Sequence, residues 1–311
     1  MYYPYLRAKQ NELIMLRENA GLIAQADIHP IIEPVRNNLN PLIKALVALL
    51  DNNCNFSIIL NPNCGDFEHG NEELIHRLNE EEILSKANVN LALILDNNMS
   101  LEDVETFLNQ YPDKKITLIH YRFELGRELA ELLSESLQSF THIFIEKHHK
   151  KRYRKMFRSD TSKRVLINDG FNKMPNSKYP KQEHFSELHI MYEEEGMNGF
   201  GDFLINGDEY SESGGPAYAV AIHLTYIDKD DDDDMFIKHY VSNRKDSPAD
   251  PGGKFLEALE KLTNDNDENI FKSSAYKEFH KLANRQHFPG LGYVKKLSMQ
   301  HHIELIADFL S

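Results

Sequence analysis

The chain has 311 residues, of which 41% are hydrophobic, and carries a formal net charge of −14 with histidine neutral. This length and composition suffice for one sizeable folded domain. The excess of acidic residues argues against general, non-specific affinity for nucleic acid, because the phosphate backbone attracts basic surfaces. No run reaches the about 18 apolar residues of a membrane span. The first residues also lack an apolar signal-peptide core, so we expect a cytoplasmic protein. The two cysteines, Cys54 and Cys64, match no common metal or redox spacing and are expected to be reduced.

Short apolar runs that end in a polar residue recur along the first 210 residues, with helix-like sequence between them. Such runs are typical of parallel strands that are buried on both faces. Seven of them lie at residues 29–33, 57–61, 91–96, 116–121, 142–146, 164–169 and 202–208, and an eighth follows at 219–225. Eight such units close a (β/α)8 barrel. The sequence therefore predicts an α/β fold, a TIM-like barrel that includes residues 1–311 as a single domain.

The connecting segments predict helices with apolar residues at helical spacing. These helices are expected at residues 42–50, 72–84, 100–108, 124–137, 150–157 and 183–195. The seventh and eighth runs are joined only by the loop 209–216, which leaves no room for a full helix. We therefore expect the seventh unit of the barrel to be irregular.

The pattern changes after residue 225. The acidic run 228–234 lies between two strand-like segments and predicts a β-hairpin extension, residues 226–250, with a solvated tip. A calcium loop of the EF type would need glycine and spaced ligands that this run lacks. Residues 251–311 predict C-terminal helices at 254–262, 274–284 and 298–310 that pack against the barrel. His301 and His302 are expected on the surface of the last helix.

The opening residues, from Tyr3 to Glu12, and the segment from Pro30 to Val35 carry a family resemblance. They resemble the start of the phage beta-protein family and its uncharacterised bacterial relatives. Those proteins open with tyrosine, proline, leucine, lysine and glutamate and then show a Pro-x-x-Glu strand end. Arg7, Lys9 and Glu33 match this pattern here, as does Glu12. The resemblance implies a barrel-like fold and a setting among phages and mobile elements, hence a role in phage defence. It implies no reaction.

Polar residues end six of the predicted strands. In a barrel of this type the active site lies at the C-terminal ends of the strands. We therefore assign four candidate catalytic residues there: Glu33, Asp96, Glu146 and Asp169. Asp96 and Asp169 are also candidate ligands of a divalent cation, magnesium or manganese, and Asn61 and Tyr121 are candidate ligand-binding residues. Crowded carboxylates can also divide into a general acid and a general base. Each residue could instead simply cap its strand.

Two further segments predict phosphate binding. Gly207, Gly214 and Gly215 leave backbone amides open to a ligand, at a position where barrels often bind phosphate. Residues 147–164 hold nine lysines and arginines against one acid, and Lys151 and Arg154 are the candidate phosphate contacts among them. A solvated outward-facing helix remains equally open for this segment. Lys9, before the first predicted strand, is a candidate ligand-binding residue at either end of the barrel.

Two functions remain open at this point. The first is binding of a phosphorylated ligand, a nucleotide or a nucleic-acid end, at the C-terminal mouth of the barrel, with metal-assisted hydrolysis of a phosphodiester as a further step. The second is a non-catalytic partner or sensor subunit that acts through protein–protein contacts, because a barrel can keep its shape without chemistry. Neither requires a membrane.

Overall fold

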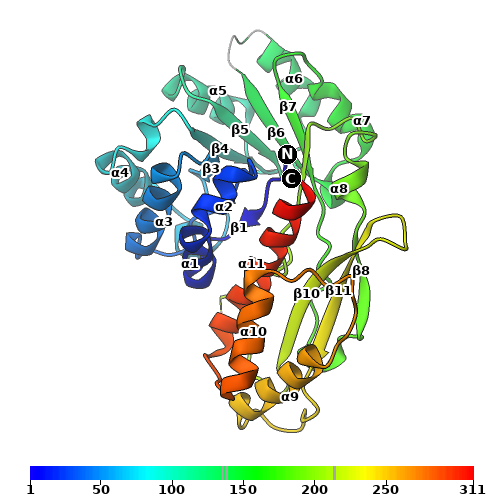
Figure 1. Cartoon of the computed structure of the whole chain (residues 1–311). Coiled ribbons are helices and arrows are strands. Elements are labelled where there is room, and N and C mark those ends of the chain that lie inside the picture. Colours follow the sequence, from blue (N-terminus) through cyan, green and yellow to red (C-terminus); the bar gives the residue numbers. More distant parts are fainter. Residues whose placement is uncertain (135, 137–138, 213–214) are drawn as a thin grey trace.

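The computed structural model describes residues 1–134, 136, 139–212 and 215–311 (Figure 1). Eight parallel strands form its central sheet, in the order β1-β2-β3-β4-β5-β6-β7-β9. They are β1 (Tyr5–Leu6), β2 (Ile31–Ile32), β3 (Phe56–Ile59), β4 (Val89–Leu95), β5 (Ile116–His120), β6 (Phe140–Ile145), β7 (Lys163–Ile167) and β9 (Gly199–Gly201). The two edges meet, because the amide of Tyr3 donates to the carbonyl of Phe200 (2.8 Å) and that of Tyr5 to the carbonyl of Asp202 (2.9 Å). The predicted TIM-like barrel is confirmed.

Two of the eight strands differ from the prediction. Residues 219–225 do not form the eighth barrel strand, because β10 (Ala221–Asp228) belongs to a separate antiparallel sheet. The barrel instead begins with β1, before the first predicted run, and ends with β9, just before the run 202–208. Both strands are too short to produce a visible apolar run. β9 also contains glycine because a Cβ on Gly201 would lie 2.1 Å from the carbonyl oxygen of Tyr3. The irregular unit is consequently the last one of the barrel.

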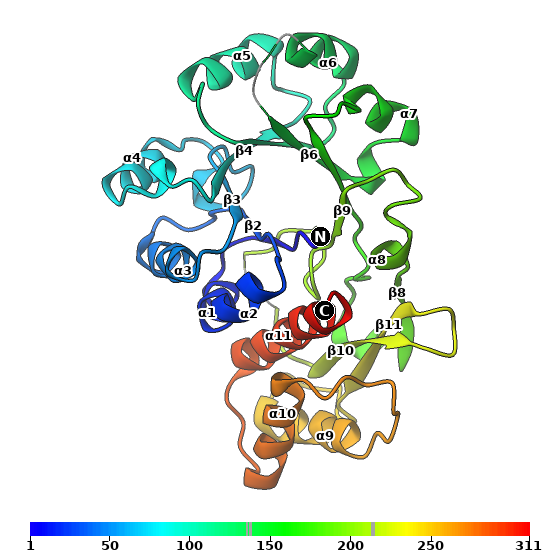
Figure 2. The same ribbon diagram turned by 45° about the horizontal axis from the view of Figure 1, so that its top comes forward.

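Helices surround the barrel, as Figure 2 shows. They are α1 (Gln10–Glu18), α2 (Ala20–Gln25), α3 (Asn40–Asp51), α4 (Glu72–Glu80), α5 (Leu101–Gln110), α6 (Gly126–Ser134), α7 (Lys151–Arg154) and α8 (Leu188–Met191). Short 3-10 turns accompany them: η1 (Gly65–Phe67), η2 (Ile83–Ser85), η3 (Glu146–His148), η4 (Lys155–Phe157) and η5 (Asn176–Lys178). Ser100 and Asp103 form a capping box at the start of α5, within the helix predicted at residues 100–108. Among the described helices, none is both long and apolar enough to cross a membrane.

The helix predicted at residues 183–195 is wrong. Residues 182–186 form β8 (Gln182–Ser186), and only α8 is helical in the rest of the segment. β8 pairs with the edge of the hairpin, with Phe236 opposite His184. The backbone hydrogen bonds offered by that edge override the local helical preference of the segment.

A second layer of structure follows the barrel in the chain. β10 and β11 (Asp234–Val241) form the predicted hairpin, and with β8 they make a three-stranded antiparallel sheet in the order β10-β11-β8. α9 (Pro251–Thr263) and α10 (Ser274–Arg285) cover this sheet with an apolar core that includes Ile222, Leu224 and Phe255. α11 (Leu291–Phe309) begins earlier than predicted and packs on both β10 and α1. Figure 1 shows α9 to α11 beside the antiparallel sheet.

The two adjacent histidines of α11 are buried rather than on its surface. His302 lies with Nε2 3.1 Å from Oδ2 of Asp202, and its Nδ1 is 2.9 Å from the hydroxyl of Thr225. His301 lies with Nε2 2.8 Å from the carbonyl of Thr225 and Nδ1 2.7 Å from the hydroxyl of Ser273. The surface expectation is wrong because both imidazoles connect α11 to β10, and His302 also reaches Asp202 after β9 while His301 reaches Ser273 at the start of α10.

Buried histidines make the fold sensitive to acid. Burial lowers the pKa of His29 and His142 to about 3 and that of His301 to about 4. In the unfolded chain these histidines bind protons near pH 6.5, whereas in the folded chain they stay neutral. The stability that the neutral, buried histidines contribute is therefore complete above pH 6.5 and is lost as the pH falls toward 4. Between pH 5.5 and 4 the unfolding free energy of the wild type should fall as the pH falls. We expect His142→Gln to make this slope shallower by about 1.4 kcal/mol per pH unit, because one titrating group is removed; urea unfolding at several pH values measures it.

The exposed His76 on α4 supplies the control, since its side chain is 72% accessible. His76→Gln should keep the pH dependence of the wild type. An unchanged slope in His142→Gln would show that the buried imidazole is not the titrating group.

Candidate functional site

Arg7 follows β1 directly and connects three segments at the mouth of the barrel, the region at the C-terminal ends of its strands. Its Nη2 lies 3.0 Å from Oδ1 of Asp208, and its Nε lies 3.5 Å from Oε2 of Glu33. Its Nη1 donates to the carbonyl of Gly207 at 3.3 Å. Both carboxylates are almost inaccessible. Arg7 therefore neutralises two buried negative charges at once.

The interior of the barrel below Arg7 is filled. Its guanidinium lies over the rings of Tyr5 and Phe203, with 5.7 and 5.5 Å to the two centroids. Beneath these rings pack apolar side chains from the strands, including Ile31, Ile94 and Ile143. Because side chains occupy the axis of the barrel, a ligand would bind among the loops of the mouth rather than inside the barrel.

Glu33, a predicted catalytic residue, lies at this mouth and accepts hydrogen bonds from three groups of the protein. It accepts hydrogen bonds from the hydroxyl of Tyr5 at 2.8 Å, the amide of Asn63 at 3.1 Å and the thiol of Cys64 at 3.4 Å. Burial and the adjacent carboxylate raise the pKa of Cys64 to about 12, so the thiol keeps its proton. Glu33 is thus fully occupied by groups of the protein itself.

Asp169 and Asp208 form the second pair of carboxylates. The backbone amide of Asp208 donates to Oδ2 of Asp169 at 2.8 Å, and Lys147 forms an ion pair with the Asp208 carboxylate. Burial raises the pKa of Asp169, and the charge of Asp208 raises it further. Gly207 has a φ of +70°, a left-handed conformation that favours glycine in this turn. Asp208 ended a predicted strand but was not recognised as part of the site.

The other predicted carboxylates do not join these two. The side chain of Asp96 accepts from the amide of Asn98 at 2.8 Å, and that of Glu146 from the side-chain amide of Asn168 at 2.7 Å. In the part of the chain that the structure describes, no group of three or more His, Cys, Asp or Glu side chains could hold a metal ion. The predicted cation site at Asp96 and Asp169 therefore gains no support from the geometry.

Asn61 and Tyr121 have local partners. The side chain of Asn61 donates to the carbonyl of Ile94 at 2.9 Å and accepts from its amide at 2.8 Å, so it joins the ends of β3 and β4. The ring of Tyr121 contacts His148 edge to face at 4.5 Å between centroids. Burial raises the pKa of Tyr121, and Asp208 raises it further. Tyr121 is therefore within electrostatic reach of the Asp208 carboxylate.

Positively charged side chains from distant segments meet around the loop that follows β9. The ammonium of Lys9 donates to the carbonyl of Ser211 and lies 4.6 Å from the centroid of Tyr210, so Lys9 reaches the mouth. Lys173 donates to the carbonyl of Glu209 at 3.1 Å, and Arg36 pairs with Glu212 at 2.6 Å. We call this set, with Arg7 and Lys295 of α11, the cation rim.

Burial and mutual repulsion among these cations lower the pKa of two lysines of the rim. Burial lowers the pKa of Lys9 against the attraction of Glu12, and Arg36, Lys173 and Arg7 lower it further. Burial likewise lowers the pKa of Lys295, and both Lys9 and Lys173 add to this effect. Sequence analysis missed Arg36, Lys173 and Lys295, because each stands in a separate segment with no local pattern around it.

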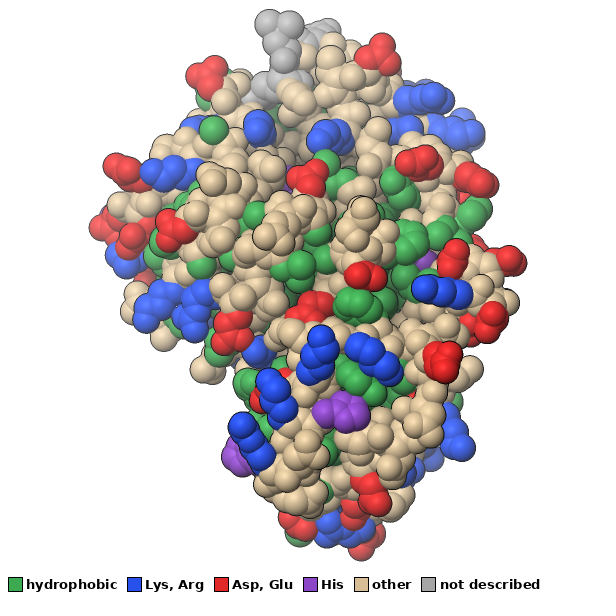
Figure 3. Space-filling view, in the orientation of Figure 1, with side chains coloured by type: hydrophobic (Ala, Val, Ile, Leu, Met, Phe, Trp, Pro, Cys, Tyr) green, Lys and Arg blue, Asp and Glu red, His purple; other side chains and the backbone are tan. Residues whose placement is uncertain are grey.

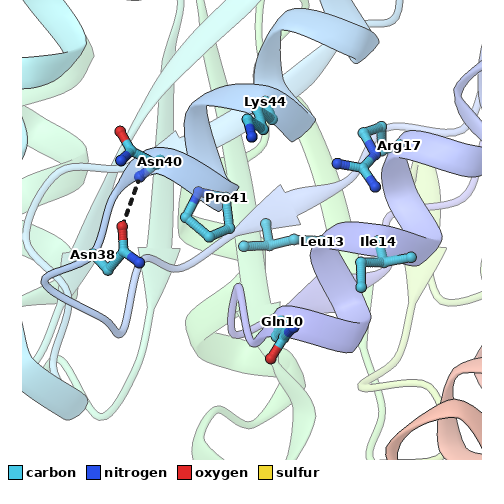
Figure 4. Close-up of a pocket in the computed structure, with 8 residues that line it drawn as sticks. All are labelled: Gln10, Leu13, Ile14, Arg17, Asn38, Asn40, Pro41 and Lys44. Carbon is cyan, nitrogen blue, oxygen red and sulfur yellow. Dashed lines mark hydrogen bonds between the residues drawn. The ribbon is translucent and has the colours of Figure 1, made fainter.

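Cavities lie beside the cation rim. One of about 500 Å3 is lined by Lys9, Arg36 and Lys295, and another of about 540 Å3 by Lys173 and Lys295, so that Lys295 borders both. A third, of about 360 Å3, lies between α1 and α3 (Figure 4). In it Leu13 and Pro41 lie side by side, with Arg17 and Lys44 among the other lining residues. The concave spaces at the mouth therefore have cationic walls.

The predicted phosphate-binding segments lie partly elsewhere. Gly214 is outside the described residues, and Gly215 is exposed at the edge of the 540 Å3 cavity. Lys151 and Arg154 both form ion pairs with Glu195, and Arg154 is buried. Figure 3 shows lysine and arginine side chains gathered at the upper right, near α6 and α7. From this segment, Lys147 rather than Lys151 or Arg154 contacts the mouth.

Comparisons with known proteins leave the site to be interpreted from its own chemistry. No protein-family model matches this sequence, and none of the curated proteins matches it either. The family resemblance of the opening residues therefore remains an expectation, and so does the setting in phage defence that it implies.

Removal of the Arg7 charge tests the structural role of the mouth. We expect Arg7→Gln to lower the unfolding free energy by about 3–5 kcal/mol, because the buried carboxylates of Glu33 and Asp208 lose their common cation. Urea unfolding at pH 7.5 measures this loss. Adding Glu33→Gln to Arg7→Gln should restore part of it, since one of the two uncompensated charges disappears. A change below about 1 kcal/mol in the single variant would contradict the assigned role.

Proposed function

We propose that this protein binds a phosphorylated ligand, a nucleotide or a nucleic-acid end, at the C-terminal mouth of its barrel. The observation that carries the proposal is the convergence of the five cations of the rim from four separate segments of an acidic chain. Clustered lysines and arginines are the groups with which proteins bind phosphate. Their repulsion costs stability unless an anion offsets it.

Two lysines of the rim are the most available for such an anion. Lys173 and Lys295 form no ion pair with any described residue, whereas Arg7 and Arg36 are paired with carboxylates. Both lysines line the cavity of about 540 Å3. A space of this size is in the range of small-molecule sites. We therefore place the phosphate groups of the ligand near these two ammonium groups.

Binding is better supported than hydrolysis. The carboxylates of the mouth already have donors or cations of the protein as partners. Metal-assisted hydrolysis of a phosphodiester is a further step of the proposal, and no set of metal ligands among the described residues supports it. On the resemblance of its opening residues we propose a phage-defence or mobile-element setting. Cys54 and Cys64 are free and buried, which agrees with the proposed cytoplasmic location.

A second candidate is a non-catalytic partner or sensor subunit. It is favoured by the filled interior of the barrel and by the exposed acidic tip at residues 229–233. Such a tip could contact a basic protein surface. This candidate and the first one differ in whether the cation rim binds a phosphorylated small molecule.

Charge reversal on the rim tests the first candidate. We expect the double variant Lys173→Glu/Lys295→Glu to weaken binding of fluorescent adenosine triphosphate and of a 5′-phosphorylated single strand by a factor of about 10–100, because two attractive charges become repulsive. Fluorescence anisotropy at two salt concentrations measures the affinities. The salt dependence of strand binding should also become shallower.

The matched control reverses two lysines of α10, in Lys277→Glu/Lys281→Glu, with the same change in net charge. This variant should bind both probes like the wild type. Equal affinities in all three proteins would refute phosphate binding at the rim, and the absence of any binding by the wild type would favour the partner subunit.

A further inference from the structure

The cavity of about 540 Å3 lies where the barrel meets the antiparallel sheet. The segment after β7 contributes Phe171 and Lys173 to its lining, β10 contributes His223, and α11 contributes Lys295. His223 has no place in the mouth network described above. Its presence beside two lysines that form no ion pair with a described residue gives the cavity an imidazole as well as cations.

A carboxylate and two imidazoles are arranged in a row behind this wall. Glu183 of β8 lies with Oε1 3.1 Å from Nε2 of His239, on β11. Nδ1 of His239 lies 2.7 Å from Nδ1 of His223. The other carboxylate oxygen of Glu183 accepts from the side-chain amide of Asn172 at 3.0 Å. These contacts cross all three strands of the antiparallel sheet.

The row fixes the tautomers of both histidines. A carboxylate only accepts, so Nε2 of His239 carries the proton in the bond to Glu183. In neutral His239, Nδ1 is then an acceptor, and His223 must donate to it from its own Nδ1. Nε2 of His223 is therefore left without a proton. This nitrogen has no hydrogen-bond partner among the described residues. It is also not among the buried polar atoms that lack a partner, so solvent reaches it.

The surroundings keep this arrangement rigid and uncharged. The side chain of His239 is inaccessible to solvent, and its ring stacks on Tyr179 at 4.5 Å between centroids. The ring of His223 contacts Phe171 and Tyr179 edge to face, at 5.2 and 4.8 Å. Burial lowers the pKa of both imidazoles, and in His239 Glu183 opposes the effect. His223 consequently presents an acceptor nitrogen rather than a cation.

We infer that this cavity holds the nucleoside part of a nucleotide, with Nε2 of His223 accepting a hydrogen bond from a hydroxyl or amino group of the ligand. Lys173 and Lys295 hold its phosphate groups, and the ring of Tyr218, which lines the cavity and is 50% exposed, stacks on its base. Glu183 and His239 are positioning residues, because they act through His223. The inference rests on the proposed function in taking the ligand to be phosphorylated.

Chemical modification with diethyl pyrocarbonate, followed by peptide mass spectrometry, tests the inference. The reagent acylates unprotonated imidazole nitrogens that solvent reaches, so we expect it to modify His223 and to spare His239. Adenosine triphosphate at ten times its Kd should slow modification of His223 about tenfold, because only the unoccupied fraction reacts. Inorganic triphosphate should bind to the lysines but leave His223 reactive.

Nitrogen-15 NMR of the histidine side chains tests the row itself. The wild type should show Nε2 of His223 without a proton. Glu183→Leu removes the acceptor and should abolish this preference, whereas the control Glu183→Gln keeps an oxygen in place and should preserve it. A protonated Nε2 in the wild type would overturn the assignment.

The two levels of the proposal fail in different ways. If adenosine triphosphate binds through Lys173 and Lys295 but does not protect His223, the proposed function stands and this inference falls. If neither adenosine triphosphate nor inorganic triphosphate binds, both fall.

Discussion

Pairing of the first barrel strand with the last is the interaction on which the rest of the structure depends. Tyr3 and Tyr5 donate backbone hydrogen bonds to the β9 segment, and an isolated parallel bridge joins Tyr2 to Phe200. Without these contacts a parallel sheet with edge strands of two and three residues would leave unpaired backbone groups at both edges. Closure also places the residues after β1 beside those after β9. Arg7 and Lys9 can therefore contact the loop that contains Gly207 and Ser211.

The last helix reinforces this closure from outside the barrel. Tyr2, at the start of the chain, and His302, near its end, both contact the carboxylate of Asp202, at 2.7 and 3.1 Å. A buried polar network of this kind specifies one arrangement, because each group left without its partner would cost free energy. The position of α11 along α1 follows from it. The same helix carries Lys295 to the cation rim, so the closure of the barrel and the composition of the mouth are linked.

The parts of the fold that sequence analysis predicted are those with a local signal. β4 is buried along all seven of its residues and therefore produces a clear apolar run, as do β5 and β6. β1 and β9 produce none, because tertiary pairing rather than a run of apolar side chains makes them strands. β8 shows the opposite case, in which a helix-like segment becomes a strand at the edge of a hairpin. Eight units were expected and eight are present, but one expected strand belongs to the other sheet.

In the candidate site, too, only the residues with a local sequence signal were predicted. Glu33 and Asp169 end buried strands, so the rule that barrel sites lie at strand ends located them. Lys173 and Lys295 stand in a loop and on a helix with no motif around them, and only the three-dimensional packing of α11 brings them together. The row of Glu183, His239 and His223 was equally hidden, since its members come from three strands of a sheet whose order no local pattern reveals. His301 and His302 are expected on the surface from sequence alone, because adjacent polar residues on a helix usually face solvent.

The distribution of charge argues for a small ligand or a strand end at the mouth. The chain as a whole carries a charge of −14, and the hairpin tip adds a local concentration of exposed acids. Such a surface repels a long polyanion along most of its length, because the repulsion acts over about 8–10 Å at physiological ionic strength. A nucleotide or a single phosphorylated end enters only the field of the cation rim. In the phosphate binding that we propose for the rim, the acidic surface would therefore select against extended nucleic acid and in favour of compact phosphates.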